Sequence, residues 1–483
     1  MNKLNILEQS FEKIKNYLNE QDDPSQVVVD FKSPGELKEI INFKIPEQGI
    51  TEQEFLNLID SYLNYSVKTS NKQFLNQLFS GFNFPAYIGE MFSVLANTSM
   101  YTYEVAPVAT IIEVEMVSLM NQYTGYEKGD GIFLSGGSNA NLIAMFSARN
   151  KFFPQARTEG VERSMKLRAF VNEQAHYSFD NAANLLGIGT NQITKVKSDD
   201  KGRLIPSELE REINLSLERN ETPFFVAATC GTTLLGAYDP LDEMANICSK
   251  YDIWLHADGS FGGSIILSDK HRHLMKGIER TDSFTWNPHK LMNIPLVCSA
   301  LLVKKKGTLQ QNIVDINSDY LFHDIDQIED LGKKSIQCGR SVDAVKLWFA
   351  WKYFGLDGYQ QRLDNLMDMA DFAEQIIHKH PRLELTSSRS SFAICFRYLP
   401  INITHDNSSD SSLDASLDSS EINDFNLQIR EVLRKSGQSL VNYGYQGDKL
   451  VIRLITSNGE LDSSDIDRFF DKFLEAARAL EKD

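Results

Sequence analysis

The stretch SFTWNPHK, residues 283–290, decides how the rest of the chain is interpreted. Phe284 and Trp286 alternate with polar residues, and this period of two predicts a strand. Pro288 then ends any sheet ladder, because it has no backbone N–H to donate. His289 and Lys290 follow at the exit of that strand. A lysine there is a poor core residue, but it becomes a good nucleophile if burial lowers its pKa.

A second motif makes Lys290 more than an exposed lysine after a strand. Upstream, WLHADGSFGG (254–263) is another apolar strand that ends in Asp258 and then in glycines. An aspartate at one strand exit and Asn-Pro-His-Lys at the next predict a site for pyridoxal 5′-phosphate (PLP). Lys290 would form the Schiff base, and Asp258 would keep the pyridine nitrogen protonated.

Composition narrows the classes of partner. The chain has 483 residues, 42% of them hydrophobic, and a formal net charge of −17. This charge argues against a nucleic acid or an anionic membrane surface as partner. We see no signal peptide and no apolar run long enough to span a membrane, so we expect a cytoplasmic protein. Its five cysteines form no CxxC pair, which favours reduced thiols and no metal site.

From about residue 130, strands and helices alternate. Seven apolar segments predict strands: Gly131–Leu134, Arg168–Val171, Ile193–Val196, Phe224–Ala228, Ile253–Ala257, Asp282–Trp286 and Val297–Val303. Four amphipathic segments predict helices: Asn139–Phe152, Ser178–Leu186, Ile205–Arg219 and Leu241–Lys250. This rhythm predicts an α/β fold with helices on both faces of a largely parallel sheet. Ligands of such folds bind at the carboxyl ends of strands, where Asp258 and Lys290 are expected.

Three parts follow along the chain. Residues 1–95 are predicted to be mostly helix and loop, with a loop at 74–83, and either pack on a partner subunit or cap their own domain. Residues 96–354 form the large PLP-binding domain, and residues 355–483 form a smaller domain of helices and short strands. Within it, about residues 405–420 are rich in Ser and Asp and poor in apolar residues, which predicts a disordered surface insertion.

Three further positions could serve a cofactor. Gly136-Gly137-Ser138-Asn139 precedes a helix, where small residues and backbone N–H groups could bind a phosphate, although such a turn is often only a turn. His176 follows a strand and could stack on the cofactor ring, or it could merely border a helix. Thr232 could hold the cofactor or form a simple turn.

Arg453 is a single charge inside an apolar strand, VIRLI. A buried arginine needs an anionic partner. That partner could be a structural carboxylate, or it could be the carboxylate of a substrate bound by both arms of the guanidinium.

Taken together, the motifs resemble the group II PLP-dependent amino-acid decarboxylases, and most of all the glutamate and cysteine-sulfinate decarboxylases. The matching segments are FLNQLFSG (74–81), NTSMYTYEVAPV (97–108), DGIFLSGGSNAN (130–141), EQAHYS (173–178), GTTLLGAYDP (231–240), WLHADGSFGG (254–263), WNPHK (286–290), CSALLV (298–303), IQCGR (336–340) and RLITSN (453–458).

The resemblance implies PLP-dependent transferase fold type I, which is aspartate-aminotransferase-like, with a smaller C-terminal α/β domain. It also implies a homodimer with active sites at the subunit interface. The implied enzyme is a carboxy-lyase that removes the α-carboxylate of a small acidic L-amino acid, releasing the amine and carbon dioxide. Cysteine sulfinate, glutamate and aspartate are the alternative substrates.

The resemblance also implies roles for individual residues. Lys290 would bind the cofactor covalently, Asp258 would pair with the pyridinium and His176 would stack on the ring. The residues implied at or near the phosphate or the ring are Ser138, Asn139, Thr232, Ser260, Asn287 and His289. Gln77 and Arg453 would hold the α-carboxylate of the substrate.

The sequence departs from the family pattern in three places. Asp258-Gly259-Ser260 stands where Asp-Ala-Ala or Asp-Ala-Ser is usual, and Val297 replaces a common glutamine. The loop from His323 to Ser335 lacks the tyrosine of glutamate decarboxylases, so His323 or His176 becomes the candidate donor of the proton to Cα. The FSG after NQL is closer to the cysteine-sulfinate branch.

Two other functions fit the same motifs. One is different PLP chemistry on this fold, such as an aldehyde-forming decarboxylase or an aminotransferase. The other is a non-catalytic scaffold, and the presence of Lys290, Asp258 and His176 argues against it.

Overall fold

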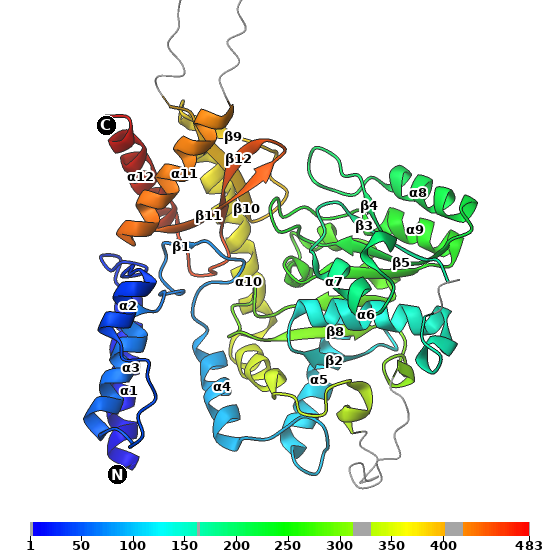
Figure 1. Cartoon of the computed structure of the whole chain (residues 1–483), viewed down its shortest axis with the longest axis horizontal. Coiled ribbons are helices and arrows are strands. Elements are labelled where there is room, and N and C mark those ends of the chain that lie inside the picture. The colour runs from blue at the N-terminus through cyan, green and yellow to red at the C-terminus, as the bar shows by residue number, and fades with distance from the viewer. Residues whose placement is uncertain (1–2, 162–164, 313–329, 401–418, 483) are drawn as a thin grey trace, which may run out of the picture. The chain divides into compact units, whose positions relative to one another are not determined.

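The computed structural model describes residues 3–161, 165–312, 330–400 and 419–482 (Figure 1). The chain divides into two compact units. The first comprises residues 82–367 and 387–392, and the second comprises residues 1–81, 368–386 and 393–483. His323, and the predicted insertion up to residue 418, lie outside the described residues. Ser419 and Ser420, at the end of that insertion, begin a helix.

A seven-stranded sheet forms the centre of the first unit. Its strands are β2 (Asp130–Leu134), β3 (Leu167–Asn172), β4 (Ile193–Val196), β5 (Thr222–Thr229), β6 (Trp254–Gly259), β7 (Ser283–Trp286) and β8 (Ser299–Val303). They lie in the order β2-β8-β7-β6-β5-β3-β4, and β8 runs antiparallel to both of its neighbours. All seven predicted strands are present, and the prediction of a largely parallel sheet is confirmed.

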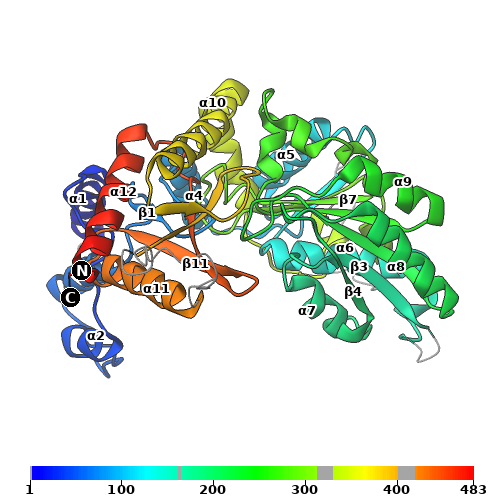
Figure 2. The same ribbon diagram turned by 90° about the horizontal axis from the view of Figure 1, so that it is seen from above.

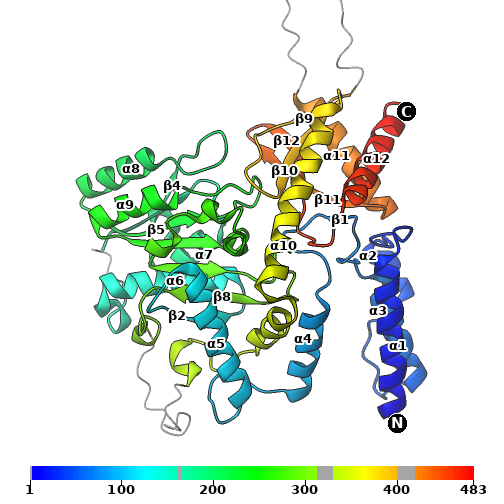
Figure 3. The same cartoon turned by 180° about the vertical axis from the view of Figure 1, so that it is seen from behind.

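Helices cover this sheet on two sides. They are α5 (Pro107–Thr124), α6 (Gly137–Phe152), α7 (Ser178–Leu185), α8 (Pro206–Glu218) and α9 (Leu241–Tyr251), and α4 (Phe84–Ala96) also belongs to this unit. Helices α6 and α7 lie on one face, and α8 and α9 lie on the other (Figures 1 and 3). Because both faces are covered, β6, β7 and β8 are buried along their whole length, and this includes the polar residues His256, Ser283 and Thr285.

The second unit contains a smaller mixed sheet and most of the remaining helices. Its strands are β1 (Phe74–Leu75), β9 (Leu383–Leu385), β10 (Ala393–Tyr398), β11 (Leu440–Gln446) and β12 (Lys449–Ile455), in the order β1-β11-β12-β10-β9. Its helices are α1 (Lys3–Asp22), α2 (Pro34–Ile40), α3 (Glu52–Tyr65), α11 (Ser419–Ser436) and α12 (Ser463–Leu480). Helix α1 runs beside α3 (Figure 3), and α11 lies along β11 (Figure 2).

Two local features differ from simple patterns. The prediction of a loop over 74–83 is wrong at its start, because Phe74 and Leu75 form β1 and pair in parallel with Leu440 and Val441. Helix α10 (Asp343–Lys379), which contributes residues to both units, is interrupted at Gly355. The φ of that residue is 67°, a conformation that favours glycine.

Packing between β6 and β7 explains why a glycine follows Asp258. A Cβ atom added to Gly259 would collide with the ring of Phe284 and would lie 2.9 Å from Cα of Gly263. The Phe284 ring is fully buried and occupies the space that an alanine methyl would need. The Gly259 departure from the family pattern is therefore a packing feature that goes with a large residue at position 284.

We expect Gly259→Ala to lower the free energy of unfolding by about 1–3 kcal/mol, because overpacking forces neighbouring groups to move. Phe284→Val should also destabilise, because it leaves a cavity. The double variant should recover part of the loss, with a coupling energy of about 0.5–3 kcal/mol. Urea unfolding of the four proteins measures this coupling, and strictly additive effects would contradict the packing explanation.

Candidate active site

A cavity of about 160 Å³ lies at the carboxyl ends of β5, β6 and β7 in the first unit. Its lining combines residues that are far apart in sequence: Gly137, Ser138, Asn141, His176, Thr229, Gly231, Thr233, Asp258, Ser260, Phe261, Asn287, His289 and Lys290. Of the ten positions predicted for the cofactor or the chemistry in this unit, counting His323, seven line one cavity. Parallel strands bring their carboxyl ends to one edge, as the sequence predicted.

Asp258 and Lys290 are the residues predicted to keep the pyridine nitrogen protonated and to form the Schiff base. Asp258 is 4% exposed. Its Oδ1 accepts the backbone N–H of Ser260 at 3.0 Å, and its Oδ2 accepts Nδ2 of Asn141 at 2.8 Å. Lys290 is half-buried in the turn after β7, where its N–H donates to the carbonyl of Asn287 at 3.1 Å. The carboxylate is thus held rigidly, and the amine lines the same cavity.

His176 lies in the loop between β3 and α7. Its Nδ1 accepts the N–H of Ser178 at 3.2 Å. Burial lowers the pKa of His176, and the nearby Lys290 lowers it further, against the opposing attraction of Asp258. At neutral pH the ring is therefore an uncharged imidazole, which suits stacking on a cationic ring.

The N-terminus of α6 offers an anion site. Its N-cap, Gly136, has a φ of 125°, and no side chain in the described part of the chain caps the first turn. A Cβ on Gly137 would lie 2.5 Å from Oγ of Ser260 and 2.7 Å from Nδ2 of Asn287, so the missing side chain lets these two polar groups approach the first turn of the helix. Free N–H groups beside a hydroxyl and an amide fit a phosphate.

His289 also lines the cavity but is fixed by the backbone. Its Nδ1 lies 2.6 Å from the carbonyl oxygen of Cys298. Burial lowers the pKa of His289 to about 4, with Lys290 and Lys346 lowering it further and the Cys298 backbone opposing the shift. The imidazole is uncharged at neutral pH, so it can contribute hydrogen bonds or packing.

Two predicted residues point elsewhere. Asn139 donates to Oγ of Ser135 at 3.0 Å, and Oγ1 of Thr232 accepts the N–H of Ala237 at 3.0 Å within a turn. Neither is among the described residues that line the cavity, and Thr233 lies there instead of Thr232. The roles predicted for Asn139 and Thr232 stay predictions, and the loop of Thr232 reaches the cavity through Thr233.

Sequence reasoning missed Asn141, whose amide contacts Asp258 directly. Asn141 follows Ser138 by three positions in α6, and residues three apart share one helix face. That spacing was the available signal, because Asn139 is turned away from this face.

Gln77 and Arg453 belong to the second unit. Arg453, in β12, is 6% exposed, and its Nη2 donates to the carbonyl of Asn76 at 3.0 Å. The carbonyl of Gln77 accepts Oγ of Ser457 at 3.4 Å. Burial lowers the pKa of Arg453, with an opposing effect of Cys395. The strand holding the arginine and the segment holding the glutamine are therefore joined within this unit.

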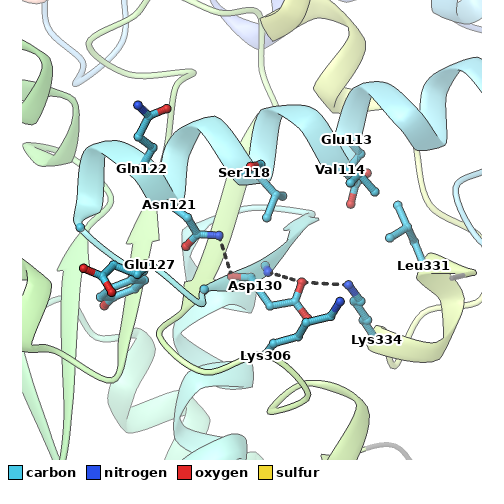
Figure 4. A pocket seen from close by; sticks show the side chains of 15 residues that line it. Glu113, Val114, Ser118, Asn121, Gln122, Glu127, Asp130, Lys306, Leu331 and Lys334 are labelled. Carbon is cyan, nitrogen blue, oxygen red and sulfur yellow. Dashed lines mark hydrogen bonds and ion pairs between the residues drawn. The ribbon is translucent and has the colours of Figure 1, made fainter. Parts of the chain in front are cut away.

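A larger cavity, of about 730 Å³, runs along α5 (Figure 4). Asp130 and Lys334 form an ion pair of 2.8 Å in its wall, and Asn121 donates to the carbonyl of Asp130 at 3.3 Å. None of the described residues that line it belongs to the predicted cofactor set. The smaller cavity therefore holds the candidate active site, although the larger one has more space.

Comparison with known proteins identifies the class. Residues 34–399 match the pyridoxal-dependent decarboxylase conserved domain, so the chain belongs to that family. It is 37% identical to cysteine sulfinic acid decarboxylase of Mus musculus over 451 residues, covering 92% of this chain and 90% of the relative. The human enzyme of the same name is 36% identical with the same coverage.

Structural comparison agrees. A crystal structure of the mouse enzyme in apo form superposes with a TM-score of 0.92, with 34% identity and 98% of each chain covered. The fold is therefore that of the PLP decarboxylases, and the chain is a PLP-dependent amino-acid decarboxylase.

The residues present fit PLP. Lys290 can bond to its aldehyde carbon, Asp258 can hold a proton at its pyridine nitrogen, and the open first turn of α6 can hold its phosphate. When bound, PLP supplies the electron sink that lets carbon dioxide leave.

We expect Lys290→Ala to abolish turnover and the visible absorption band of the bound cofactor, because no other amine replaces the covalent link. Lys270→Ala is the control, since the Lys270 side chain is 63% exposed, and it should leave both unchanged. Absorption spectra and single-turnover assays measure the effect. Turnover of Lys290→Ala at a rate comparable to wild type would contradict the assignment.

Proposed function

We propose that this enzyme removes the α-carboxylate of a small acidic L-amino acid, with cysteine sulfinate as its preferred substrate and glutamate and aspartate as weaker ones. The observation that carries the proposal is the meeting of Lys290, Asp258 and His176 at one cavity. The relatives named as cysteine sulfinic acid decarboxylases, together with the FSG segment at 79–81, favour the sulfinate.

Each step of the proposed reaction is assigned to a side chain of this protein. Lys290 holds the cofactor until the amine of the substrate displaces it, and later releases the product amine. Asp258 keeps a proton at the ring nitrogen. His176 or His323, which lies outside the described residues, passes a proton to Cα after carbon dioxide has left. His176 must first take up that proton, because its lowered pKa leaves the resting ring uncharged at neutral pH.

We further propose that Arg453 and Gln77 bind the α-carboxylate. A guanidinium offers two parallel N–H donors to a carboxylate. The bond from Nη2 of Arg453 to Asn76 holds that arginine next to Gln77 and supports a shared role.

A homodimer in the cytoplasm completes the proposal. Apolar side chains are exposed on two neighbouring segments, including Leu95 (77%) and Val108 (71%) at the ends of α4 and α5, which supports burial against a second copy. No cysteine forms a disulfide in the described part of the chain, which suits a reducing compartment. Among the described residues, no helix is both long and apolar enough to cross a membrane.

The function is tested by incubating the enzyme and PLP with cysteine sulfinate, glutamate, aspartate and neutral amino acids, followed by mass analysis. We expect amine and carbon dioxide, with the highest kcat/KM for cysteine sulfinate. Aldehyde as the main product would replace this proposal with an oxidative decarboxylation, and a neutral amino acid as the best substrate would overturn the substrate class.

Arg453→Lys should raise KM or lower kcat for acidic substrates by about tenfold or more, because a point charge cannot replace the planar fork. Arg397→Lys is a matched control, since Arg397 is similarly buried in β10 and pairs with Glu384. This control should cost stability without changing KM. Unchanged kinetics for Arg453→Lys would remove Arg453 from the substrate site.

The assembly is tested by light scattering after gel filtration, where we expect twice the chain mass of 54.8 kDa. Val108→Glu should shift the protein toward monomers, because it places a charge on the exposed apolar face of α5. A wild-type protein that is monomeric at micromolar concentration would contradict the dimer.

A further inference from the structure

A connected series of buried polar side chains reaches Oδ2 of Asp258, the carboxylate oxygen to which the Ser260 N–H does not donate. Its centre is Asn141, on α6, which is 1% exposed. Its amide nitrogen donates to Oδ2 of Asp258 at 2.8 Å and to Oγ of Ser178 at 3.0 Å. Its amide oxygen contacts Nε2 of His256 at 3.0 Å and accepts Oγ1 of Thr285 at 2.9 Å. Every donor and acceptor position of this amide is therefore used.

The donor and acceptor groups of these side chains allow only one direction of donation along this series of hydrogen bonds. A carboxylate can only accept, so the nitrogen of the Asn141 amide faces Asp258 and its oxygen faces His256. His256 must then donate from Nε2. Burial lowers the pKa of His256 to about 4, against the attraction of Asp258, so the ring is neutral at pH 7 and carries only this one proton.

The other side of His256 agrees with that tautomer. Its Nδ1 lies 2.8 Å from Oγ of Ser283, which itself accepts Nε1 of Trp254 at 2.9 Å. Ser283 can therefore donate to the unprotonated Nδ1. Each side chain in this series therefore donates a hydrogen bond to the next, from Trp254 through Ser283, His256 and Asn141 to Asp258. At no contact do two donors or two acceptors face each other.

Ser178 links the same asparagine to the second cofactor residue. Its hydroxyl accepts from Asn141, while its backbone N–H donates to Nδ1 of His176. Asn141 thus contacts Asp258 directly and reaches His176 through one residue. Movement of this amide would disturb both.

We propose that Asn141 is a positioning residue, which with His256 behind it fixes Asp258 and His176 for their contacts with PLP. Asn141 donates to one oxygen of the Asp258 carboxylate and the N–H of Ser260 donates to the other, so the plane of the carboxylate cannot rotate. A carboxylate fixed in this way can hold the proton at the pyridine nitrogen throughout the reaction.

The test compares Asn141→Ala with Asn150→Ala. Asn150 lies on the same helix, is 6% exposed and donates to Asn312, away from the cavity. Both variants should lower Tm, because each removes a buried hydrogen bond. Each apo protein is then loaded with PLP labelled with ¹⁵N at the ring nitrogen, and the ¹⁵N chemical shift reports whether that nitrogen holds a proton.

We expect the ¹⁵N resonance of Asn141→Ala to move toward the unprotonated position, and the Kd for PLP to rise. Because the lost bond is to a charged group, kcat should fall on the order of 10- to 100-fold, with KM changed much less. Asn150→Ala should match wild type in all three readouts.

His256→Phe provides a second variant if Asn141→Ala does not fold. A phenyl ring can keep the stacking of His256 on Phe225, whose centroid is 5.8 Å away, while removing both hydrogen bonds. It should move the ¹⁵N resonance in the same direction by a smaller amount, since Thr285 still holds Asn141. If the folded variants keep the wild-type ¹⁵N resonance and the wild-type Kd for PLP, this series of hydrogen bonds only stabilises the fold.

The ¹⁵N shift and the Kd need no substrate, so they test this proposal even if the proposed acidic substrate is wrong.

Discussion

Burial of one carboxylate, that of Asp258 at the carboxyl end of β6, is the constraint on which the arrangement around the cavity depends. A buried charge is costly unless hydrogen bonds compensate for it. Here one donor comes from the turn after β6 and the other from a side chain on α6. The helix and the strand must therefore keep one relative position, and the central sheet provides it.

The same requirement explains why the polar side chains of the core gather behind this point. Asn141, His256, Ser283 and Thr285 are all buried, on one helix and two adjacent strands. Isolated, each would be an unsatisfied polar group in an apolar interior. Together they satisfy one another's hydrogen bonds, and the series of donors ends at Asp258, the one group that can only accept. Burial removes the second proton of His256, and this makes the direction of the chain unambiguous.

Much of the fold could be predicted because the strands of the central sheet carry apolar residues either in short runs or in alternation with polar residues, and amphipathic helices separate most of them. The seven strands and the helices between them were predicted to within about two residues in most cases. The short strand β1 was missed, since two residues carry no periodicity and their pairing with β11 lies more than 360 residues away along the chain. The candidate site could be predicted at the level of loops, but the side chain of each loop that lines the cavity could not. Thr232 and Asn139 were chosen where Thr233 and Asn141 line the cavity, because a motif identifies a turn but not which of its side chains faces inward.

Gly259 differs from the family pattern at a position next to a residue of the candidate active site. Its position directly after Asp258 suggests a change of substrate or mechanism. Its contacts argue against such a change. The space beside Gly259 is filled by Phe284 from the next strand, and the hydrogen bonds of Asp258 come from Ser260 and Asn141. Gly259 takes no part in the side-chain hydrogen bonds of Asp258, so this position can vary with its packing partner without removing those bonds. Substrate preference must therefore be argued from groups that contact the side chain of the amino acid, because the α-carboxylate, for which Arg453 and Gln77 are the proposed ligands, is common to all the candidate substrates.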